Sequence, residues 1–399
     1  MRRKRKPRLR RKEVLRIERK KRITSNWVVI AMFLLLIFGF TAATLVWPRR
    51  EFSERENRSL HLFPKPTLTT VLNGEFESDY ETYLSDQFPG RDGWIAAKTT
   101  AERAIGKDEI KDVYFAKDGY LIESHKGSFT TDNAVQNIER LSAFIEAQQE
   151  RFGEGHVSVM IIPNAVEVLK EKLPRFAPDS GEAQYLAQIE ERLPSGTYFD
   201  ALSVLDDHKE EYLYYRTDHH WTTLAAFYVY EAWAKEKGFQ PAPITDYTRE
   251  VLTDDFLGTI ESKVGGRMEG DTIERFLPKE QVSYTLDYNQ GQKTGTDLYD
   301  LSMLETKDKY SVFFGGNQPI VTAKIDNGSD KKLLVIKDSY AHCFIPFTFD
   351  DYGEVTFLDL RYFNESLNGY LDQNEYTDLL FLYNASGFAE DVSLGRLAN

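Results

Sequence analysis

The sequence predicts an α/β protein in which helices flank a parallel sheet, with a transmembrane helix before the sheet and a mixed β insertion within it. Three observations support this prediction. Short apolar runs typical of buried strands alternate with helical patterns over residues 111–399. Residues 27–47 carry no charge and have the length of a helix that spans a membrane. Residues 246–330 break the alternation and are richer in Thr, Asp, Gly and Tyr.

The first segment, residues 1–26, is strongly basic. Residues 1–23 hold 14 of the 50 Lys and Arg residues but only two of the 63 acidic residues, so the rest of the chain is acidic. A basic flank before an apolar run is typical of the cytoplasmic side of a membrane helix, and it attracts anionic lipid. We therefore expect a basic cytoplasmic tail. The acidic body argues against a nucleic-acid partner, which would need basic contacts to phosphate.

Residues 27–47 are predicted to be the transmembrane helix. Trp27 and Trp47 bracket the run, as aromatic residues do at membrane interfaces. A cleaved signal peptide would also place a charged segment before an apolar run. However, this run is longer than a usual signal core, and residues 48–50 (Pro-Arg-Arg) do not form a small-residue cleavage site. We expect a single-pass cell-membrane anchor with the N-terminus cytoplasmic and the C-terminal domain extracellular.

Residues 48–110 are predicted to form a juxtamembrane stalk and a helical lead-in. Residues 49–66 are polar and contain two prolines, which favours an extended stretch. Residues 70–106 show helical patterning that is broken at residues 88–92. The α/β domain then begins near residue 111 with the sequence VYFAKDGYLIE, in which a Lys-Asp-Gly turn between two apolar runs predicts a hairpin.

The body of the domain, residues 111–399 with an insertion at about 246–330, alternates in element type. Asp132–Phe152 has apolar residues near helical spacing, with Thr131 or Asp132 available as N-cap. Residues 156–162 (HVSVMII) are a buried-strand run that ends at Pro163. The same reasoning predicts helices over 182–193 and 223–237, and strands over 333–336, 355–360 and 379–383.

The first motif that could carry chemistry is Arg-Thr-Asp-His-His-Trp-Thr at residues 216–222. It lies between an aromatic strand-like run and a helix, where ligand-facing residues of α/β folds gather. In an extended stretch residues i and i+2 point the same way, so Asp218 and His220 would share a face, with His219 opposite. A carboxylate beside an imidazole orients the ring and stabilises its cation. The alternative is a capped helix start whose histidines only satisfy local hydrogen bonds.

The second motif follows the apolar run 333–336, where a polar turn leads into an apparent helix start. A serine there, Ser339, would expose its hydroxyl at the carboxyl end of the sheet, near backbone N–H groups. The alternative role for Ser339 is a common N-cap. Together, Ser339, His220 and Asp218 make a complete set for acyl transfer, a chemistry that needs no cofactor.

Two other chemistries are less favoured by the sequence. A zinc site at residues 218–220, with His342 as a further ligand, would require adjacent histidines to bind one ion, and no His-Glu-x-x-His spacing is present. We therefore predict no metal. Cys343 is the single cysteine, which excludes a disulfide within the chain, and a lone cysteine after a strand is more often packed than nucleophilic.

The motifs carry a family resemblance. Asp-His-His-Trp at residues 218–221 resembles the bacterial DHHW proteins, and the likeness covers about residues 50–390. The pattern TDxHWT is similar to that of the SGNH-like alginate O-acetyltransferases. Further matching segments are SERENRSL (53–60), GEF…YLSDQFPGRD (74–92), YFAKDGYL (114–121), FFGGNQP (313–319), KDSYA (337–341) and DLRYF (359–363).

The resemblance implies an SGNH-hydrolase-like parallel sheet and assigns roles to residues. Asp218 would be the orienting acid, His220 the general base and Ser339 the nucleophile, in the permuted order that the alginate acetyltransferases show. Lys337 departs from the Gly that leads the usual serine motif, and His219 replaces a small residue. The oxyanion blocks of ordinary SGNH enzymes are not recognisable. The predicted substrate-binding residues are His219, Trp221, Asn164, Tyr340 and Arg361.

The resemblance also implies a function. We expect a membrane-anchored O-acetyltransferase that acts outside the membrane on a cell-surface polysaccharide through an acetylated serine. Such an enzyme implies a multipass membrane O-acyltransferase as partner. Two alternatives stay open: a carbohydrate esterase on the same site, because both reactions share the acyl-enzyme, and a non-catalytic glycan-binding or scaffold protein.

Overall fold

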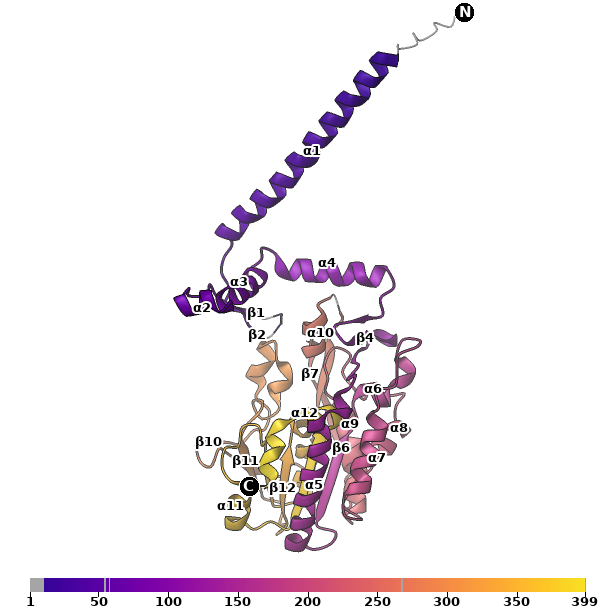
Figure 1. Ribbon diagram of the computed structural model, residues 1–399. Helices are drawn as coiled ribbons and strands as arrows, with labels where there is room; N and C mark the ends of the chain where they lie inside the picture. Colours follow the sequence, from indigo (N-terminus) through magenta and orange to yellow (C-terminus); the bar gives the residue numbers. More distant parts are fainter. Residues whose placement is uncertain (1–10, 54, 57, 267, 399) are drawn as a thin grey trace, which may run out of the picture. The chain divides into compact units, whose positions relative to one another are not determined.

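A computed structural model describes residues 11–53, 55–56, 58–266 and 268–398 (Figure 1). The chain forms two compact units: Met1–Ser53 with Arg58–Trp94, and Glu54–Asn57 with Ile95–Asn399. The first ten residues of the predicted basic tail lie outside the described residues.

The first unit contains the apolar segment. Helix α1 (Arg11–Val46) includes all but the last residue of the predicted transmembrane run. Within the described residues, Glu18–Val46 is the one helical stretch that is long and apolar enough to cross a membrane. It is followed by the paired strands β1 (Phe52–Ser53) and β2 (Arg58–Ser59) and by the helices α2 (Leu68–Leu72) and α3 (Glu75–Asp86). Helix α4 (Arg91–Ala104) continues from this unit into the second.

The second unit opens with a small antiparallel sheet. Strand β3 (Glu109–Ile110) pairs with β4 (Val113–Phe115), which pairs with β5 (Leu121–Glu123), so the predicted hairpin is confirmed. Asp118 in the turn has a φ of 57°, a left-handed conformation that Asp tolerates better than most residues. Helix α5 (Asp132–Phe152) then begins at Thr131, whose side chain accepts a hydrogen bond from the Ala134 N–H.

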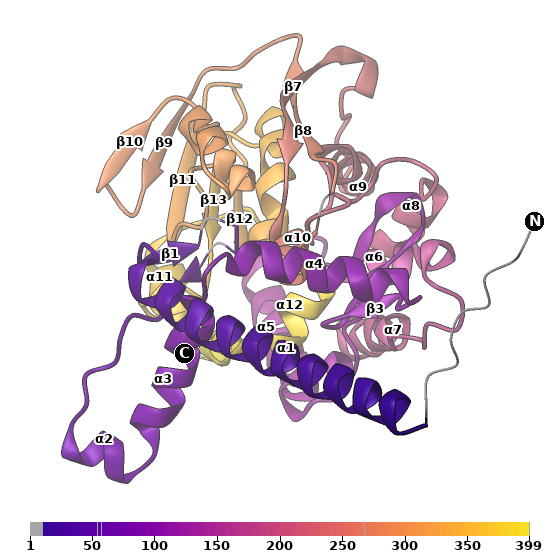
Figure 2. The same ribbon diagram turned by 90° about the horizontal axis from the view of Figure 1, so that it is seen from above.

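The main sheet has seven strands in the order β10-β9-β11-β13-β12-β14-β6, part of which can be followed in Figure 2. Strands β13 (Glu354–Leu358), β12 (Lys332–Lys337), β14 (Asp378–Asn384) and β6 (Val157–Ile162) are parallel. Strands β11 (Ile320–Ile325), β9 (Tyr284–Tyr288) and β10 (Lys293–Gly295) are antiparallel to their neighbours.

The sheet is therefore mixed, and the prediction of a parallel sheet holds for its β13–β6 half alone. The antiparallel strands come from the stretch that the sequence marked as an insertion. Residues 326–331 connect β11 to β12, and a connection of this length cannot hold the crossover that parallel strands need. The chain must turn back, so β11 runs against β12 and β13.

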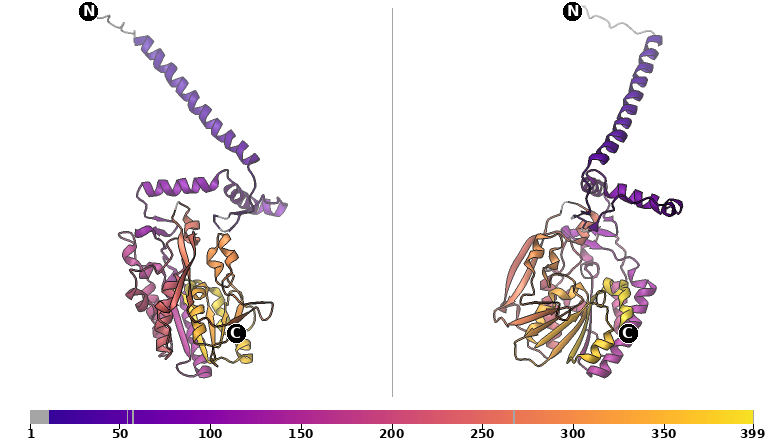
Figure 3. Two further views of the ribbon diagram at one scale, coloured as in Figure 1. Left: turned by 180° about the vertical axis from the view of Figure 1, so that it is seen from behind. Right: turned by 90° about the vertical axis from the view of Figure 1, so that its left-hand side faces the viewer.

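Both faces of the parallel half are covered, which explains why the central residues of its strands are mostly apolar on both faces. Successive side chains of β12 enter opposite cores: Leu333 and Val335 on one side, Leu334 and Ile336 on the other. One core includes residues of α5, α7 (Glu182–Arg192), α11 (Leu367–Gln373) and α12 (Ala385–Glu390), and Figure 3 shows α5 and α12 against that face. The other includes residues of α6 (Ala165–Val168), α8 (Ala201–Asp207) and α9 (Thr223–Glu236).

Residues 247–278, between α9 and β9, form a hairpin with a short helix, which we call the arm. Strands β7 (Tyr247–Phe256) and β8 (Asp271–Pro278) pair antiparallel, and the short helix α10 (Thr259–Val264) lies between them in sequence. The 3-10 helices are η1 (Lys117–Gly119), η2 (Ser128–Thr130), η3 (Lys170–Lys172), η4 (Ile244–Asp246), η5 (Leu301–Glu305), η6 (Lys309–Val312), η7 (Ser339–Cys343), η8 (Ile345–Asp350) and η9 (Val392–Ala398).

Candidate active site

Ser339 is the first residue of η7, immediately beyond the carboxyl end of β12. The N-cap of η7 is Asp338, whose side chain accepts a hydrogen bond from the Tyr340 N–H at 2.8 Å. The same carboxylate accepts hydrogen bonds from the backbone N–H and the side-chain amide of Asn384, at the end of β14. Because Asp338 caps the helix, the Ser339 hydroxyl is not engaged as a cap, and it lines a cavity.

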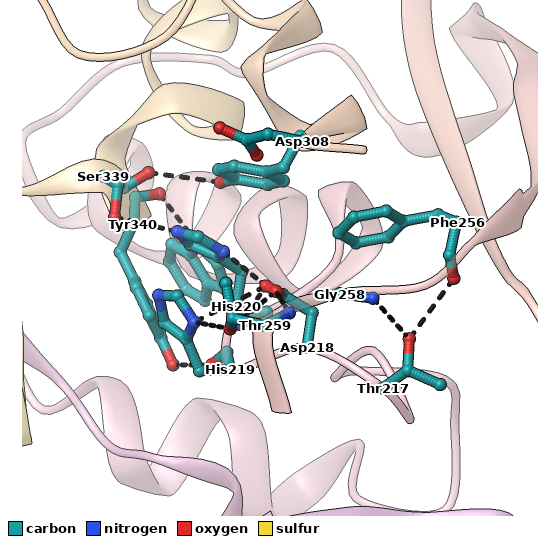
Figure 4. A network of polar contacts seen from close by, with 12 residues as sticks. Thr217, Asp218, His219, His220, Phe256, Gly258, Thr259, Asp308, Ser339 and Tyr340 are labelled. Carbon is teal, nitrogen blue, oxygen red and sulfur yellow. Dashed lines mark hydrogen bonds and ion pairs between the residues drawn. The ribbon is translucent and has the colours of Figure 1, made fainter. Parts of the chain in front are cut away.

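The Ser339 hydroxyl lies 2.8 Å from Nε2 of His220 (Figure 4). The other ring nitrogen, Nδ1, lies 2.5 Å from Oδ1 of Asp218. An ionised carboxylate can only accept, so Nδ1 carries the proton and Nε2 can accept from Ser339. The ring of Tyr310 stacks on the imidazole, with 3.7 Å between ring centroids and 15° between planes. The three side chains thus lie within the distances that nucleophile, base and orienting acid require.

Asp218 is buried and held by a second element. Its Oδ2 accepts hydrogen bonds from Thr259 N at 2.8 Å and Thr259 Oγ1 at 3.0 Å, both at the start of α10. A Cβ atom on Gly258 would lie 2.2 Å from Cβ of Asp218, so the close approach of α10 requires glycine there. Burial opposes ionisation, but His219, His220 and these hydrogen bonds hold the pKa of Asp218 well below its usual value.

His220 has a lowered pKa because it is buried. Burial, assisted by the nearby His219, lowers the pKa of His220 to about 4 against the opposing attraction of Asp218. The imidazole is therefore unprotonated at neutral pH. In the ordinary general-base role it could take a proton from a hydroxyl without first losing one of its own.

Asp271, at the start of β8, anchors the loop that carries Asp218 and His220. It is buried and accepts four hydrogen bonds: from Tyr212 Oη at 2.5 Å, Arg216 N at 2.8 Å, Thr217 N at 2.7 Å and Thr217 Oγ1 at 2.6 Å. Neither Asp271 nor Thr259 was identified from the sequence. The local signal in the sequence is a glycine directly before each of them, at positions 258 and 270.

The cavity beside Ser339 has a volume of about 490 Å³ and includes two of the five predicted substrate-binding residues, His219 and Arg361. His219 Nδ1 lies 2.8 Å from Thr259 Oγ1, so the two adjacent histidines make different contacts. The other three do not line this cavity. They form the wall behind the site.

Tyr340, Trp221 and Asn164 are all buried. The Tyr340 hydroxyl donates to the His219 carbonyl, and Trp221 Nε1 donates to the Tyr340 carbonyl at 2.8 Å. The amide of Asn164 donates to Asn384 Oδ1 at 3.2 Å and accepts from the Ser386 N–H at 2.9 Å. These contacts fix the relative positions of the His219 loop, η7 and the end of β14.

Lys337, which departs from the usual serine motif, is fully buried at the end of β12. Its ammonium lies 2.8 Å from His342 Nε2 and 3.3 Å from Asp359 Oδ2. Asp359 also binds Arg361, with Nε to Oδ1 at 2.8 Å and Nη2 to Oδ2 at 2.6 Å. The buried cation is therefore paired, and the same carboxylate holds Arg361 at the cavity.

The alternative chemistries are poorly supported at these positions. Asp218, His219 and His220 place ligand atoms within 4.8 Å of one another, as a metal site would. However, the Asp218 oxygens and the His220 nitrogens are already engaged in the hydrogen bonds described above, which a metal would have to displace. Cys343 is buried, and burial raises the pKa of its thiol to about 12, so it is not a ready nucleophile.

Comparison with known proteins gives one family and several similar folds. The family model described as DHHW protein matches residues 121–358. The probable alginate O-acetylase AlgJ of Pseudomonas syringae pv. tomato is 24% identical over 238 residues, which are 57% of this chain and 55% of that protein. The chain thus matches only about half the length of this curated relative.

The solved structures with a similar fold include the following two. A DHHW family protein from Eubacterium siraeum is 24% identical, with a TM-score of 0.61 over 73% of this chain and 96% of that one. Bacillus cereus PatB1, solved with a sulfonyl adduct, is 21% identical, with a TM-score of 0.58 over 71% of this chain and 99% of that one. These likenesses show an α/β fold of the same kind.

Proposed function

This chain belongs to the DHHW family, and we propose that it is a membrane-anchored O-acetyltransferase that modifies a cell-surface polysaccharide outside the membrane. The observation that carries the proposal is the contact of Ser339 with His220 and of His220 with Asp218, at 2.8 and 2.5 Å. The curated relative is named as a probable alginate O-acetylase, which supports acetyl transfer to a polysaccharide. The apolar helix α1 supports membrane anchoring.

The proposed reaction has two halves that use the same groups. His220 Nε2 takes the proton of Ser339 Oγ as that oxygen attacks the acetyl carbonyl, and it returns the proton to the departing group. A sugar hydroxyl then gives its proton to His220 while its oxygen attacks the acetyl-serine. Collapse of this second intermediate releases Ser339, which recovers its proton from His220.

Asp218 and the start of η7 would stabilise the charges that develop. Asp218 keeps the ring in the required tautomer and offsets the positive charge on His220. The Ser339 N–H has no hydrogen-bond partner among the described residues, and it is the first N–H group of η7. It is the natural donor to the oxyanion of both tetrahedral intermediates.

The acyl donor would come from the membrane side. We propose a multipass membrane O-acyltransferase as partner, as the resemblance to the alginate O-acetyltransferases implies. If water rather than a sugar accepts the acetyl group, the same site is an esterase.

The test is Ser339→Ala in the full-length protein in detergent, with nitrophenyl acetate as donor. We expect acetate release to fall by at least about 10³-fold, because no acyl-enzyme can form. Stability should change by less than about 1.5 kcal/mol, the range for one hydrogen bond, because Asp338 rather than Ser339 is the cap. A sulfonyl fluoride should label wild-type Ser339, read by mass spectrometry.

The control is Ser302→Ala, which removes an exposed hydroxyl that contacts Asp300 instead. It should keep both labelling and turnover. Undiminished acetate release by Ser339→Ala would refute the acyl-enzyme. Transfer of acetyl to an added oligosaccharide distinguishes a transferase from an esterase, which would yield free acetate alone.

A further inference from the structure

We infer that the cavity beside Ser339 accepts a glycan that bears hydroxyl or amino groups and no carboxylates. The inference rests on the proposed acetyl transfer and concerns the acceptor at the same site. The cavity is lined by five acidic and three cationic residues: Asp112, Glu123, Asp338, Glu390, Asp391, Lys126, Lys263 and Arg361.

Each of the three cationic side chains already has a carboxylate partner. Asp359 binds Arg361 through two oxygens. Lys263 lies 3.0 Å from Glu123, and Lys126 contacts Glu109. A carboxylate on a ligand would have to compete with these partners, so the cations do not make an anion site.

Four of the five acidic residues form no salt bridge with the described residues, and one of them, Asp338, is engaged by Tyr340 and Asn384. Glu390 accepts a hydrogen bond from Ser128 Oγ at 2.7 Å, and Asp112 makes no side-chain hydrogen bond to the described residues. Asp391 uses Oδ1 to accept from the Ser393 N–H at 2.7 Å. Its other oxygen, Oδ2, is buried and has no partner in the described part of the chain.

A second buried polar group lines the same cavity without a partner. Tyr383, on β14, is fully buried, and its hydroxyl makes no hydrogen bond to the described residues. Burial and the nearby Asp359, Asp391 and Asp338 carboxylates raise the pKa of Tyr383 well above its usual value, so it remains a donor. Buried polar groups are normally satisfied, and both residues with an unpartnered oxygen line this cavity.

A sugar hydroxyl fits this pair of requirements. It can donate to Asp391 Oδ2 and accept from Tyr383 Oη, and an ammonium group can donate to Asp391 and to Glu390. A uronate carboxylate can only accept, and it would face Asp112, Glu390 and Asp391. Repulsion between the uronate carboxylate and these carboxylates would weaken the binding of a uronate-containing glycan. The site should therefore reject a polymer such as alginate, whose sugars each carry a carboxylate.

The experiment compares acceptors on the full-length protein in detergent, with nitrophenyl acetate as donor. The acceptors are cellohexaose, a partly deacetylated chitohexaose and a hexamer of mannuronate, and acetylated product is measured by mass spectrometry. We expect kcat/KM for both non-uronate hexamers to exceed that for the uronate by at least tenfold at low salt. The difference should narrow at high salt, which screens the carboxylates. A uronate that equals or exceeds the other two overturns the inference.

The variant Asp391→Asn tests the assigned group. It should raise kcat/KM for the uronate relative to cellohexaose by at least threefold, while Asp207→Asn, which alters an exposed carboxylate at the end of α8, should leave the ratio unchanged. Binding of the three hexamers to Ser339→Ala, measured calorimetrically, gives a ranking that needs no turnover. Equal binding of all three, or none, also overturns the inference. If the wild-type protein released no more acetate than Ser339→Ala, the proposed function itself would be refuted.

Discussion

Asp271→Asn offers the sharpest test of how the arm of residues 247–278 supports the site. The four donors to Asp271 come from Tyr212, Arg216 and Thr217, all at 2.8 Å or less. An amide replaces one of the two oxygens by a donor, so about two of the four hydrogen bonds are lost whichever way it is oriented. At about 1.5–3 kcal/mol for each hydrogen bond to a charged group, unfolding should become easier by about 3–6 kcal/mol.

That loss should be visible in two measurements on the full-length protein in detergent. A loss of this size lowers Tm by at least about 6 °C in a large domain, measured by thermal melting. Acetate release from nitrophenyl acetate, measured well below the new Tm, should also fall, since the loop that carries Asp218 loses its anchor. The matched control is Asp255→Asn on the same hairpin, an exposed partner of Lys309 that should cost at most about 1 kcal/mol. An Asp271→Asn protein with wild-type Tm and turnover would refute the reasoning.

Two further outcomes follow from the site and from α1. Burial lowers the pKa of His220 to about 4. We therefore expect kcat/KM for nitrophenyl acetate to stay near its plateau down to pH 5.5 and to fall as the pH drops through about 4, where His220 becomes protonated. A midpoint near pH 6.5 in the pH–rate profile would contradict a buried His220. Protease added to spheroplasts should degrade residues 48–399 and spare a tag at the N-terminus; a body that resists digestion until lysis would reverse the topology.

Much of the parallel half of the sheet could be predicted because strands that are buried on both faces have consecutive apolar residues in the sequence. Strands β6, β12 and β14 each contain a short, mostly apolar run, such as residues 333–336 and 379–383, and this local pattern is enough to find them. The antiparallel strands β9, β10 and β11 carry a weaker pattern. Their joining to the edge of β13 depends on a partner that lies far along the chain, which no local pattern encodes.

The candidate site also contains residues that the sequence could identify and residues that it could not. Ser339 and the Asp218–His220 pair stand at junctions of strand and helix, so the sequence could single them out. Thr259 and Asp271 contact the loop from positions 41 and 54 residues away. The glycine that precedes each of them does not by itself indicate such a contact. Belonging to a motif also did not show which residues line the cavity and which are buried behind it. Trp221 and Tyr340 belong to the two motifs, yet both side chains are buried behind the site.

The buried pair of Lys337 and Asp359 has a consequence for how the family can vary. Loss of Asp359 alone would leave an ammonium group with no exposure and only His342 as a neighbour, and loss of Lys337 alone would change the balance of charge around Arg361. Single substitutions at either position should therefore be rare, while joint replacement by apolar or small residues would remove both buried charges together and leave only Arg361 without its partner. Lineages whose serine motif begins with glycine instead of lysine should lack the aspartate as well, so the two positions should covary.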